Sequence, residues 1–177
     1  MIDALRVAAL ALAVGVGPVA LAAQPLPSEH ALVAQTVAGT TIQVEYYRPV
    51  ARGRELFGKL VPWGVPWTPG ANWATTIDVD HAVRVNGTPL PRGKYTVFAI
   101  PERDAWTVIL DRRTHIYHTQ RPRADEEQLR LVVKPEAVPP TEVLTWWFPL
   151  VARDAATLRM QWGTTGISLE IGTTSEP

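Results

Sequence analysis

The chain has no cysteine, only three serines and no excess of either charge. The lack of cysteine excludes a disulfide, a thiolate metal site and a cysteine nucleophile. The serines leave little room for a serine hydrolase, since Ser168 has no nucleophile-elbow glycines around it. Lys plus Arg and Asp plus Glu each total 17, with no basic block, so we expect no nucleic-acid partner.

Long apolar runs are also scarce, and the longest uncharged one lies near the N-terminus, within residues 1–23. Within Met1–Ala23, Arg6 precedes an uncharged run from Val7 to Val19, and Ala20-Leu21-Ala22 resembles a signal-peptidase site. The run is shorter than the about 20 residues that span a bilayer. We therefore expect residues 1–23 to be a cleaved signal peptide, with an uncleaved anchor as the alternative. The mature protein would be periplasmic or secreted and have no membrane span.

The 177 residues suit a single domain. We expect a short lead at 24–30, one β-domain at 31–172 and a tail at 173–177. Thr41–Tyr46 alternates apolar and polar residues, the period of a half-buried strand. The predicted strands are Ala31–Val37, Thr41–Tyr46, Thr75–Val79, Ala82–Val85, Lys94–Ile100, Trp106–Asp111, Gln128–Lys134, Val143–Phe148, Thr157–Trp162 and Ile167–Ile171.

Turn residues separate most of these strands. Asn86-Gly87 is a dipeptide that favours a hairpin turn, and the residues from Gly163 to Gly166 also predict a turn. Little helix is expected, although Arg123–Leu131 could hold one turn before its strand. Nine or ten short strands predict an all-β fold, an antiparallel and jelly-roll-like β-sandwich, with a closed barrel as the alternative.

A long segment from Arg48 to Trp73 interrupts the strand pattern. It holds four prolines, four glycines and three tryptophans, without alternation. Loops of this length are usually functional or disordered. Because this one is so apolar, we expect it to be ordered and to fold back onto the sandwich.

Several motifs carry a family resemblance. Those in the loop are Tyr46-x-Arg48-Pro49, Gly53-Arg54, Phe57-Gly58, Leu60-Val61-Pro62-Trp63-Gly64, Trp67 and Gly70-Ala71-Asn72-x-Ala74-Thr75-Thr76. Those that follow are Val85-Asn86-Gly87, Leu90-Pro91-x-Gly93-x-Tyr95 and Trp106-Thr107-Val108-Ile109-Leu110. Over about residues 32–171 the chain resembles the bacterial domain-of-unknown-function family number twenty-nine eleven. The resemblance implies an exported all-β domain and brings no settled activity.

The chain departs from that family's pattern at two places. The family usually has Arg-Thr after the tryptophan equivalent to Trp67, and Glu after the asparagine equivalent to Asn72. Here Thr68-Pro69 and Trp73 occupy those positions. A charged site shared by the family would therefore lack both charges in this chain.

Aromatic residues are the first candidates for a ligand surface. Trp63, Trp67 and Trp73, with Tyr46 or Tyr47, could form a platform at one end of the sandwich, because flat rings stack on sugars and apolar ligands. Burial of the three indoles as core is the alternative.

Polar loop residues are the second set of candidates. Arg48, Arg54 and Asn72 could bind a carboxylate or phosphate, or could instead tie loop carbonyls to the sheet, which we favour. Glu45 could pair with either arginine. His115 and His118 are weak candidates for a metal site because no clear third ligand accompanies them. No cofactor or metal is expected.

Three functions remain open. The first is a non-catalytic binding or accessory module of the cell envelope, whose partner is a small apolar or sugar-like ligand or an envelope protein. The second is a small enzyme, a hydrolase or isomerase, with an Arg/Asn/aromatic pocket. The third is a purely structural interaction domain. An enzyme should show titratable groups with displaced pKa values converging in a pocket, whereas a binding module should show exposed indoles.

Overall fold

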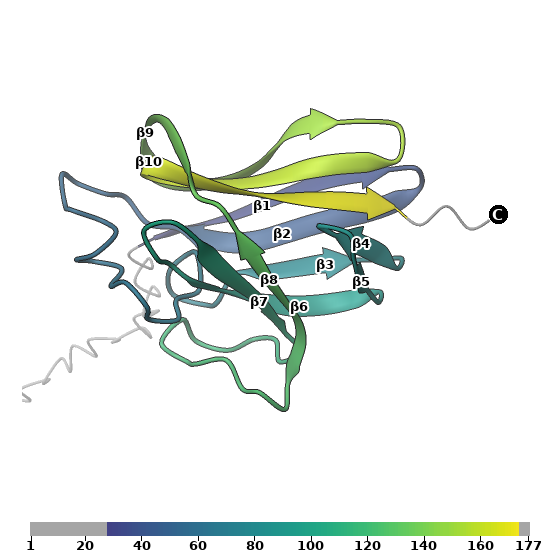
Figure 1. Ribbon diagram of the computed structural model, residues 1–177, viewed down its shortest axis with the longest axis horizontal. Helices are drawn as coiled ribbons and strands as arrows, with labels where there is room; N and C mark the ends of the chain where they lie inside the picture. The colour runs from purple at the N-terminus through teal and green to yellow at the C-terminus, as the bar shows by residue number, and fades with distance from the viewer. Residues whose placement is uncertain (1–27, 174–177) are drawn as a thin grey trace, which may run out of the picture.

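The structure is a computed structural model that describes residues 28–173, and it consists of two antiparallel sheets (Figure 1). The larger sheet has the order β1 (Glu29–Val37), β2 (Thr40–Arg48), β3 (Thr76–Val79), β6 (Gly93–Ile100), β7 (Trp106–Asp111) and β8 (Glu127–Val133). The smaller sheet has the order β5 (Thr88–Leu90), β4 (Val83–Val85), β10 (Ala155–Thr173) and β9 (Glu136–Val151). The expected signal peptide, residues 1–23, lies outside the described residues.

The strands form where the apolar alternation predicts them. In β2, Ile42 and Val44 are fully buried in the core, whereas Gln43 and Glu45 lie on the other face of the sheet. The apolar faces of both sheets contribute to one continuous core. The predicted antiparallel β-sandwich is confirmed, and residues 28–173 contain no helix. Accordingly, no helix in this range is long and apolar enough to cross a membrane.

Two hairpin turns have the backbone that their residues favour. Asn86 and Gly87, between β4 and β5, both have positive φ, 46° and 79°. Ala38 and Gly39, between β1 and β2, have φ of 45° and 82°. Such turns match the twist of the strands that they join. Asn86-Gly87 is thus the predicted hairpin, and its second strand, β5, is one that alternation over three residues does not reveal.

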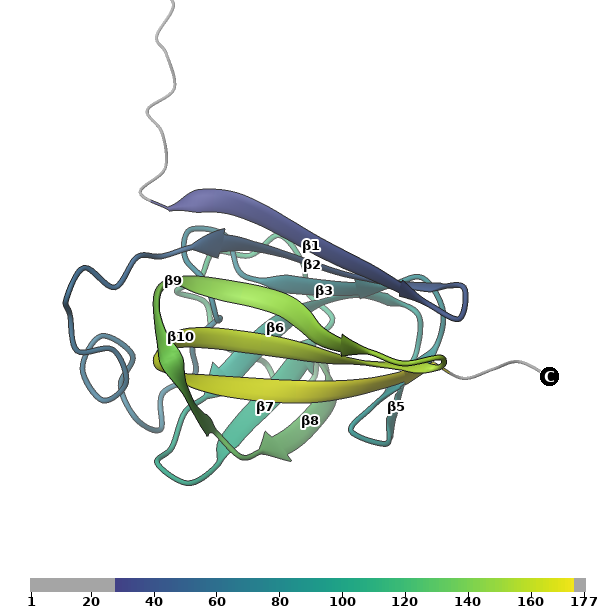
Figure 2. The ribbon, with the colours of Figure 1, turned by 90° about the horizontal axis from the view of Figure 1, so that it is seen from above.

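The strand β10 reverses direction at the predicted turn. Its Thr157 hydroxyl donates to the Glu170 carboxylate (2.9 Å), and its Arg159 Nε donates to Ser168 Oγ (3.1 Å). Residues 13 apart in a straight strand would be separated by about 40 Å. The chain therefore folds back between Gly163 and Gly166, as Figure 2 shows. One arm of β10 pairs with β9 and the other with β4.

One detail differs from the sequence-based prediction. A single turn at residues 124–126 precedes β8, where a turn of helix was considered. Three prolines lie inside β9, at 139, 140 and 149. They are accommodated because β9 is an edge strand of its sheet, where a missing N–H leaves no neighbour without a partner.

Candidate functional site

The long segment between β2 and β3 is ordered and closes one end of the sandwich (Figures 1 and 2). Near its start, Ala51 N–H donates to Glu142 O of β9 (2.8 Å). Farther along, Trp67 and Ala99 of β6 exchange two backbone hydrogen bonds, of 2.8 and 2.7 Å. The segment is therefore bonded to both sheets, and we refer to residues 49–75 as the docked loop.

Both loop arginines bind backbone carbonyls. Arg54 donates to Ala51 O (2.9 Å) and Val50 O (2.6 Å). Arg48 donates to Leu144 O (3.3 Å) and to the Thr145 hydroxyl (3.1 Å). These bonds satisfy carbonyls that a folded-back loop would otherwise leave without partners. The contacts match the structural role favoured for the two arginines.

Glu45 pairs with neither arginine. Its carboxylate accepts hydrogen bonds from Lys94 Nζ (2.8 Å) and His30 Nε2 (3.0 Å). These bonds, with that from Lys94 the stronger, hold the pKa of Glu45 below its ordinary value. The acid thus belongs to a polar cluster on the outward face of the larger sheet.

The three loop tryptophans lie in three different surroundings. Trp67 packs against the core and stacks on Trp162 of β10, with ring centroids 6.0 Å apart. Trp63 is half-buried beneath the Arg103 guanidinium, 5.7 Å from its ring. Trp73 is 38% exposed and stacks on His115 at 4.3 Å. The structure does not gather the three indoles into one platform.

The side chains of Tyr46 and Asn72 both form hydrogen bonds to backbone groups. The Tyr46 hydroxyl accepts a hydrogen bond from Trp146 N–H (3.1 Å) and is itself buried. Asn72 is buried with positive φ, 55°, and its side-chain amide donates to Ser28 O (3.1 Å). Their polar groups are therefore occupied within the protein.

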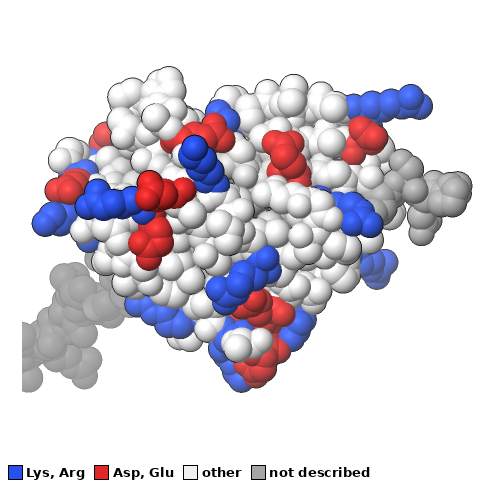
Figure 3. Space-filling model, viewed as in Figure 1, with Lys and Arg blue, Asp and Glu red and all other residues white. Residues whose placement is uncertain are grey.

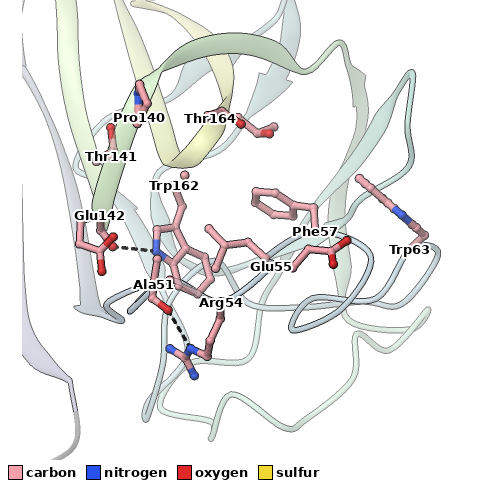
Figure 4. A pocket seen from close by; sticks show the side chains of 14 residues that line it. Ala51, Arg54, Glu55, Phe57, Trp63, Pro140, Thr141, Glu142, Trp162 and Thr164 are labelled. Atoms are coloured by element: carbon pink, nitrogen blue, oxygen red, sulfur yellow. Dashed lines mark hydrogen bonds between the residues drawn. The ribbon is translucent and has the colours of Figure 1, made fainter.

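A pocket of about 590 Å³ lies between the docked loop and the reversal of β10 (Figure 4). This volume is within the usual range for small-molecule sites. We call it the end pocket; its lining residues are Ala51, Gly53, Arg54, Glu55, Leu56, Phe57, Trp63, Pro140, Thr141, Glu142, Trp162, Gly163, Thr164 and Thr165.

Aromatic rings form much of the end pocket. Trp162 lies near its middle, with Glu142 on one side and Phe57 and Trp63 on the other (Figure 4). Trp162 Nε1 donates to Glu142 O (3.2 Å), which fixes the indole. The ring centroids of Phe57 and Trp63 are 6.3 Å apart. This wall offers apolar surface to a ligand that enters from solvent.

Some polar groups of the end pocket already form hydrogen bonds within the protein, whereas another is free. Glu142 Oε1 accepts the Arg52 backbone N–H (2.6 Å), and the Thr141 hydroxyl accepts from Gln161 Nε2 (2.5 Å). Within residues 28–173, the Glu55 carboxylate has no hydrogen-bond or ion-pair partner. Glu55 is therefore the charged group of the pocket that is free to bind a ligand.

Glycines shape this pocket at two positions. Gly58 has φ of +93°, and a Cβ there would lie 2.5 Å from Trp63 Nε1. Gly163 has φ of +59°, and a Cβ there would lie 2.8 Å from Leu56 Cδ1. Only glycine combines these backbone angles with such close approach.

A smaller pocket of about 340 Å³ adjoins the same loop. It shares Arg54 and Trp162 with the end pocket and is also lined by Leu60, Trp67 and His118. Burial lowers the pKa of His118 and so favours its neutral form.

The two histidines considered for metal binding line different pockets. His115 lines a pocket with Trp73, whereas His118 lines two pockets with Trp67. In the described part of the chain, no three His, Cys, Asp or Glu side chains are grouped as metal ligands would be.

Among the described residues, the Asp111 carboxylate is fully buried, and it forms an ion pair with Arg113. Burial raises the pKa of Asp111, but Arg113 and the backbone N–H groups of Arg113 and Arg123 outweigh it and hold that pKa below its ordinary value. The Arg113 Nη2 to Asp111 Oδ2 distance is 2.6 Å. This ion pair anchors the connection between β7 and β8. It is not part of the end pocket.

Sequence reasoning located one side of the end pocket, through Arg54 and Trp63. It did not assign Phe57, Trp162 or Thr164 to a site. Gly163 was the available signal, since a turn glycine beside a tryptophan marks a place where another segment can approach closely.

No curated protein and no solved structure matches the chain. A family model described as "Protein of unknown function (DUF2911)" matches residues 28–171, most of the chain and nearly all of the described fold. The resemblance carried by the loop motifs is thereby confirmed, and the chain belongs to the DUF2911 family of proteins of unknown function.

Proposed function

We propose that this protein is an exported, non-catalytic binding module of the cell envelope, and that its ligand occupies the end pocket. The signal-peptide pattern of residues 1–23 supports export to the periplasm or the exterior. The end pocket supports binding, because it combines apolar rings with a few polar groups, as small-molecule sites do.

The observation that carries the proposal is the free carboxylate of Glu55 beside Phe57 and Trp63. The Arg54 guanidinium turns toward the carbonyls of Val50 and Ala51, so the positive group of the lining is already bonded. The pocket thus offers acceptors and apolar surface. It suits an apolar or sugar-like ligand that donates hydrogen bonds through hydroxyl or ammonium groups.

The lining lacks a bonded pair of a nucleophile and a base. Glu142 is bonded to the Arg52 backbone, and the lining holds no histidine, lysine or serine. Of its three threonines, Thr141 bonds to Pro139 O and Gln161 Nε2, and within residues 28–173 the Thr164 and Thr165 hydroxyls have no hydrogen-bonded base. The usual activated nucleophile of covalent catalysis is therefore missing from the lining. Recognition without reaction is the function that these groups support best.

Calorimetric titration of the mature protein tests the proposal. The probes are octyl glucoside, 2-phenylethanol and 2-phenylethylamine, with 3-phenylpropionate as the probe that donates no hydrogen bond when ionised. We expect the three donors to bind and the carboxylate to be rejected. Glu55→Gln and Trp63→Ala should each weaken binding about tenfold or more.

Trp147→Ala is the matched control, because Trp147 is 39% exposed on β9 and does not line the end pocket. Equal affinity for donors and the carboxylate, or binding unaffected by Trp63→Ala, would contradict the proposed site. Chemical conversion of a probe would instead support the small-enzyme alternative.

A further inference from the structure

A second group of rings lies outside the end pocket. Tyr47 comes from the end of β2, Trp73 from the end of the docked loop, and His115 and Tyr117 from the connection between β7 and β8. The Trp73 ring stacks on His115 at 4.3 Å and 17° and meets Tyr117 edge-on at 5.8 Å. The fold thus brings together rings that are up to 70 residues apart in the chain.

Backbone bonds hold these rings in place. Ala74 N–H donates to Ile116 O (2.9 Å), and His118 N–H donates to Asn72 O (3.0 Å). The two segments form a short ladder on either side of Trp73. The rings are therefore positioned before any ligand arrives, which reduces the entropy that binding would cost.

Strained backbone flanks the stack. Asn72 and His115 are not glycines, yet both have φ of 55°, in the left-handed region. Such conformations are strained for residues other than glycine and collect at functional sites. Here they place the Trp73 and His115 rings against each other.

The rings are nevertheless left partly in water. Trp73 is 38% exposed and Tyr117 is 45% exposed. Large apolar groups that gather at a surface commonly mark a place of interaction. A pocket of about 270 Å³ opens here, and Tyr47, Trp73 and His115 line it.

The polar side of this pocket carries balanced charge. Glu45 and Lys94 line it and bond to each other at 2.8 Å, and His30 binds the second oxygen of Glu45. The pair offers a hydrogen-bond acceptor and a donor without a net field. A charged ligand gains little from such a pair, whereas a neutral ligand with several hydroxyls can use both partners.

We propose that this pocket, lined by Tyr47, Trp73, His115, Glu45 and Lys94, is a second binding site that takes one ring of a neutral saccharide. The C–H face of the sugar would lie on the Trp73 and Tyr47 rings, and its hydroxyls would bond to Glu45 and Lys94. The pocket shares no lining residue with the end pocket, so the two sites are separable by mutation.

Saturation-transfer NMR and calorimetry on the mature protein test this site with maltotriose, cellotriose and the trimer of N-acetylglucosamine. We expect at least one trisaccharide to bind and Trp73→Ala to weaken it at least tenfold. Trp73→Leu, which keeps apolar bulk without a flat face, should weaken it similarly. Trp147→Ala should leave it unchanged, and every variant should melt within a few degrees of the parent.

Three results would overturn the proposal. One is that none of the three saccharides binds. Another is that binding survives Trp73→Ala but is lost in Trp63→Ala, which would place the sugar in the end pocket. The third is that adenosine, a flat heteroaromatic probe, binds through Trp73 while the saccharides do not, which would reject the ligand class.

Discussion

The indole of Trp67 in the docked loop stacks on the indole of Trp162 in β10, with centroids 6.0 Å apart and planes inclined by 21°. One ring comes from the loop and the other from the small sheet, so the contact joins the loop to the sandwich. Trp162 is 2% exposed and lines the end pocket. The packing of the loop and the shape of the pocket therefore depend on the same pair.

Replacing Trp67 should destabilise the fold. Trp67→Ala removes the stack on Trp162 and the contact with Phe57, and large-to-small changes at such positions cost about 3 kcal/mol. Urea unfolding measures the loss. Trp147→Ala is the control and should cost under about 1 kcal/mol, since its ring is 39% exposed. Equal, small effects for the two variants would show that Trp67 does not pack as described.

Alanine substitutions at two loop glycines distinguish the cost of backbone strain from the cost of a steric clash. Gly53 and Gly58 both have positive φ, 68° and 93°, but a Cβ at Gly53 meets nothing within 4 Å, whereas one at Gly58 meets Trp63 Nε1 at 2.5 Å. Gly53→Ala should cost about 1 kcal/mol from its backbone angle alone. Gly58→Ala should cost clearly more and shift the Trp63 fluorescence. Equal costs would contradict the position of the Trp63 ring.

Two fully buried threonines should respond to valine in opposite directions. Among the described residues, Thr68 Oγ1 has no hydrogen-bond partner, whereas the Thr75 hydroxyl donates to Pro69 O at 2.8 Å. Thr68→Val removes an unsatisfied polar atom and should stabilise by about 1 kcal/mol. Thr75→Val leaves the Pro69 carbonyl without its donor and should destabilise by about 1–3 kcal/mol. Thermal melting distinguishes them, and a loss of stability in Thr68→Val would mean that its hydroxyl is satisfied.

The Asp111–Arg113 pair should make the free energy of unfolding depend on pH in the acid range. The pKa of Asp111 is lower in the folded state than its ordinary value near 3.9, so its contribution is present above about pH 4 and is lost as pH falls through the folded-state pKa. Asp111→Asn should cost about 3 kcal/mol at pH 7 and progressively less below pH 4. Urea unfolding at pH 7, 4 and 2.5 follows the change.

Asp125→Asn is the control for that series. Asp125 pairs with Arg123 at 2.7 Å, but both side chains are more than half exposed, so solvent screens the pair. The variant should unfold like the parent at every pH. A gap between Asp111→Asn and the parent that stayed constant down to pH 2.5 would contradict the role given to the carboxylate.

The strands were predictable because their signal is local. Alternation in segments such as Thr41–Tyr46, and turn residues such as Asn86-Gly87, act over a few residues and need no knowledge of distant packing. β5 was missed because three residues around Pro89 show no period. The ordering of the docked loop was predictable too, since its apolar content requires burial.

The sites were only partly predictable, for a physical reason. Arg54 and Trp63 belong to the loop itself, but Glu142 and Trp162 reach the end pocket from strands about 80 to 100 residues later in the chain. Trp73 and His115 meet only because two loops pair through backbone bonds. Such contacts depend on how the sheets pack, which local periodicity does not contain.

Hydrogen exchange of the loop amides tests most directly whether residues 49–75 are a packed part of the fold that shapes a binding pocket. The Ala51 and Trp67 N–H groups donate to Glu142 O and Ala99 O, both at 2.8 Å. We expect these two amides to exchange as slowly as those of β6. Exchange at the rate of an unstructured peptide, with β6 still protected, would contradict it.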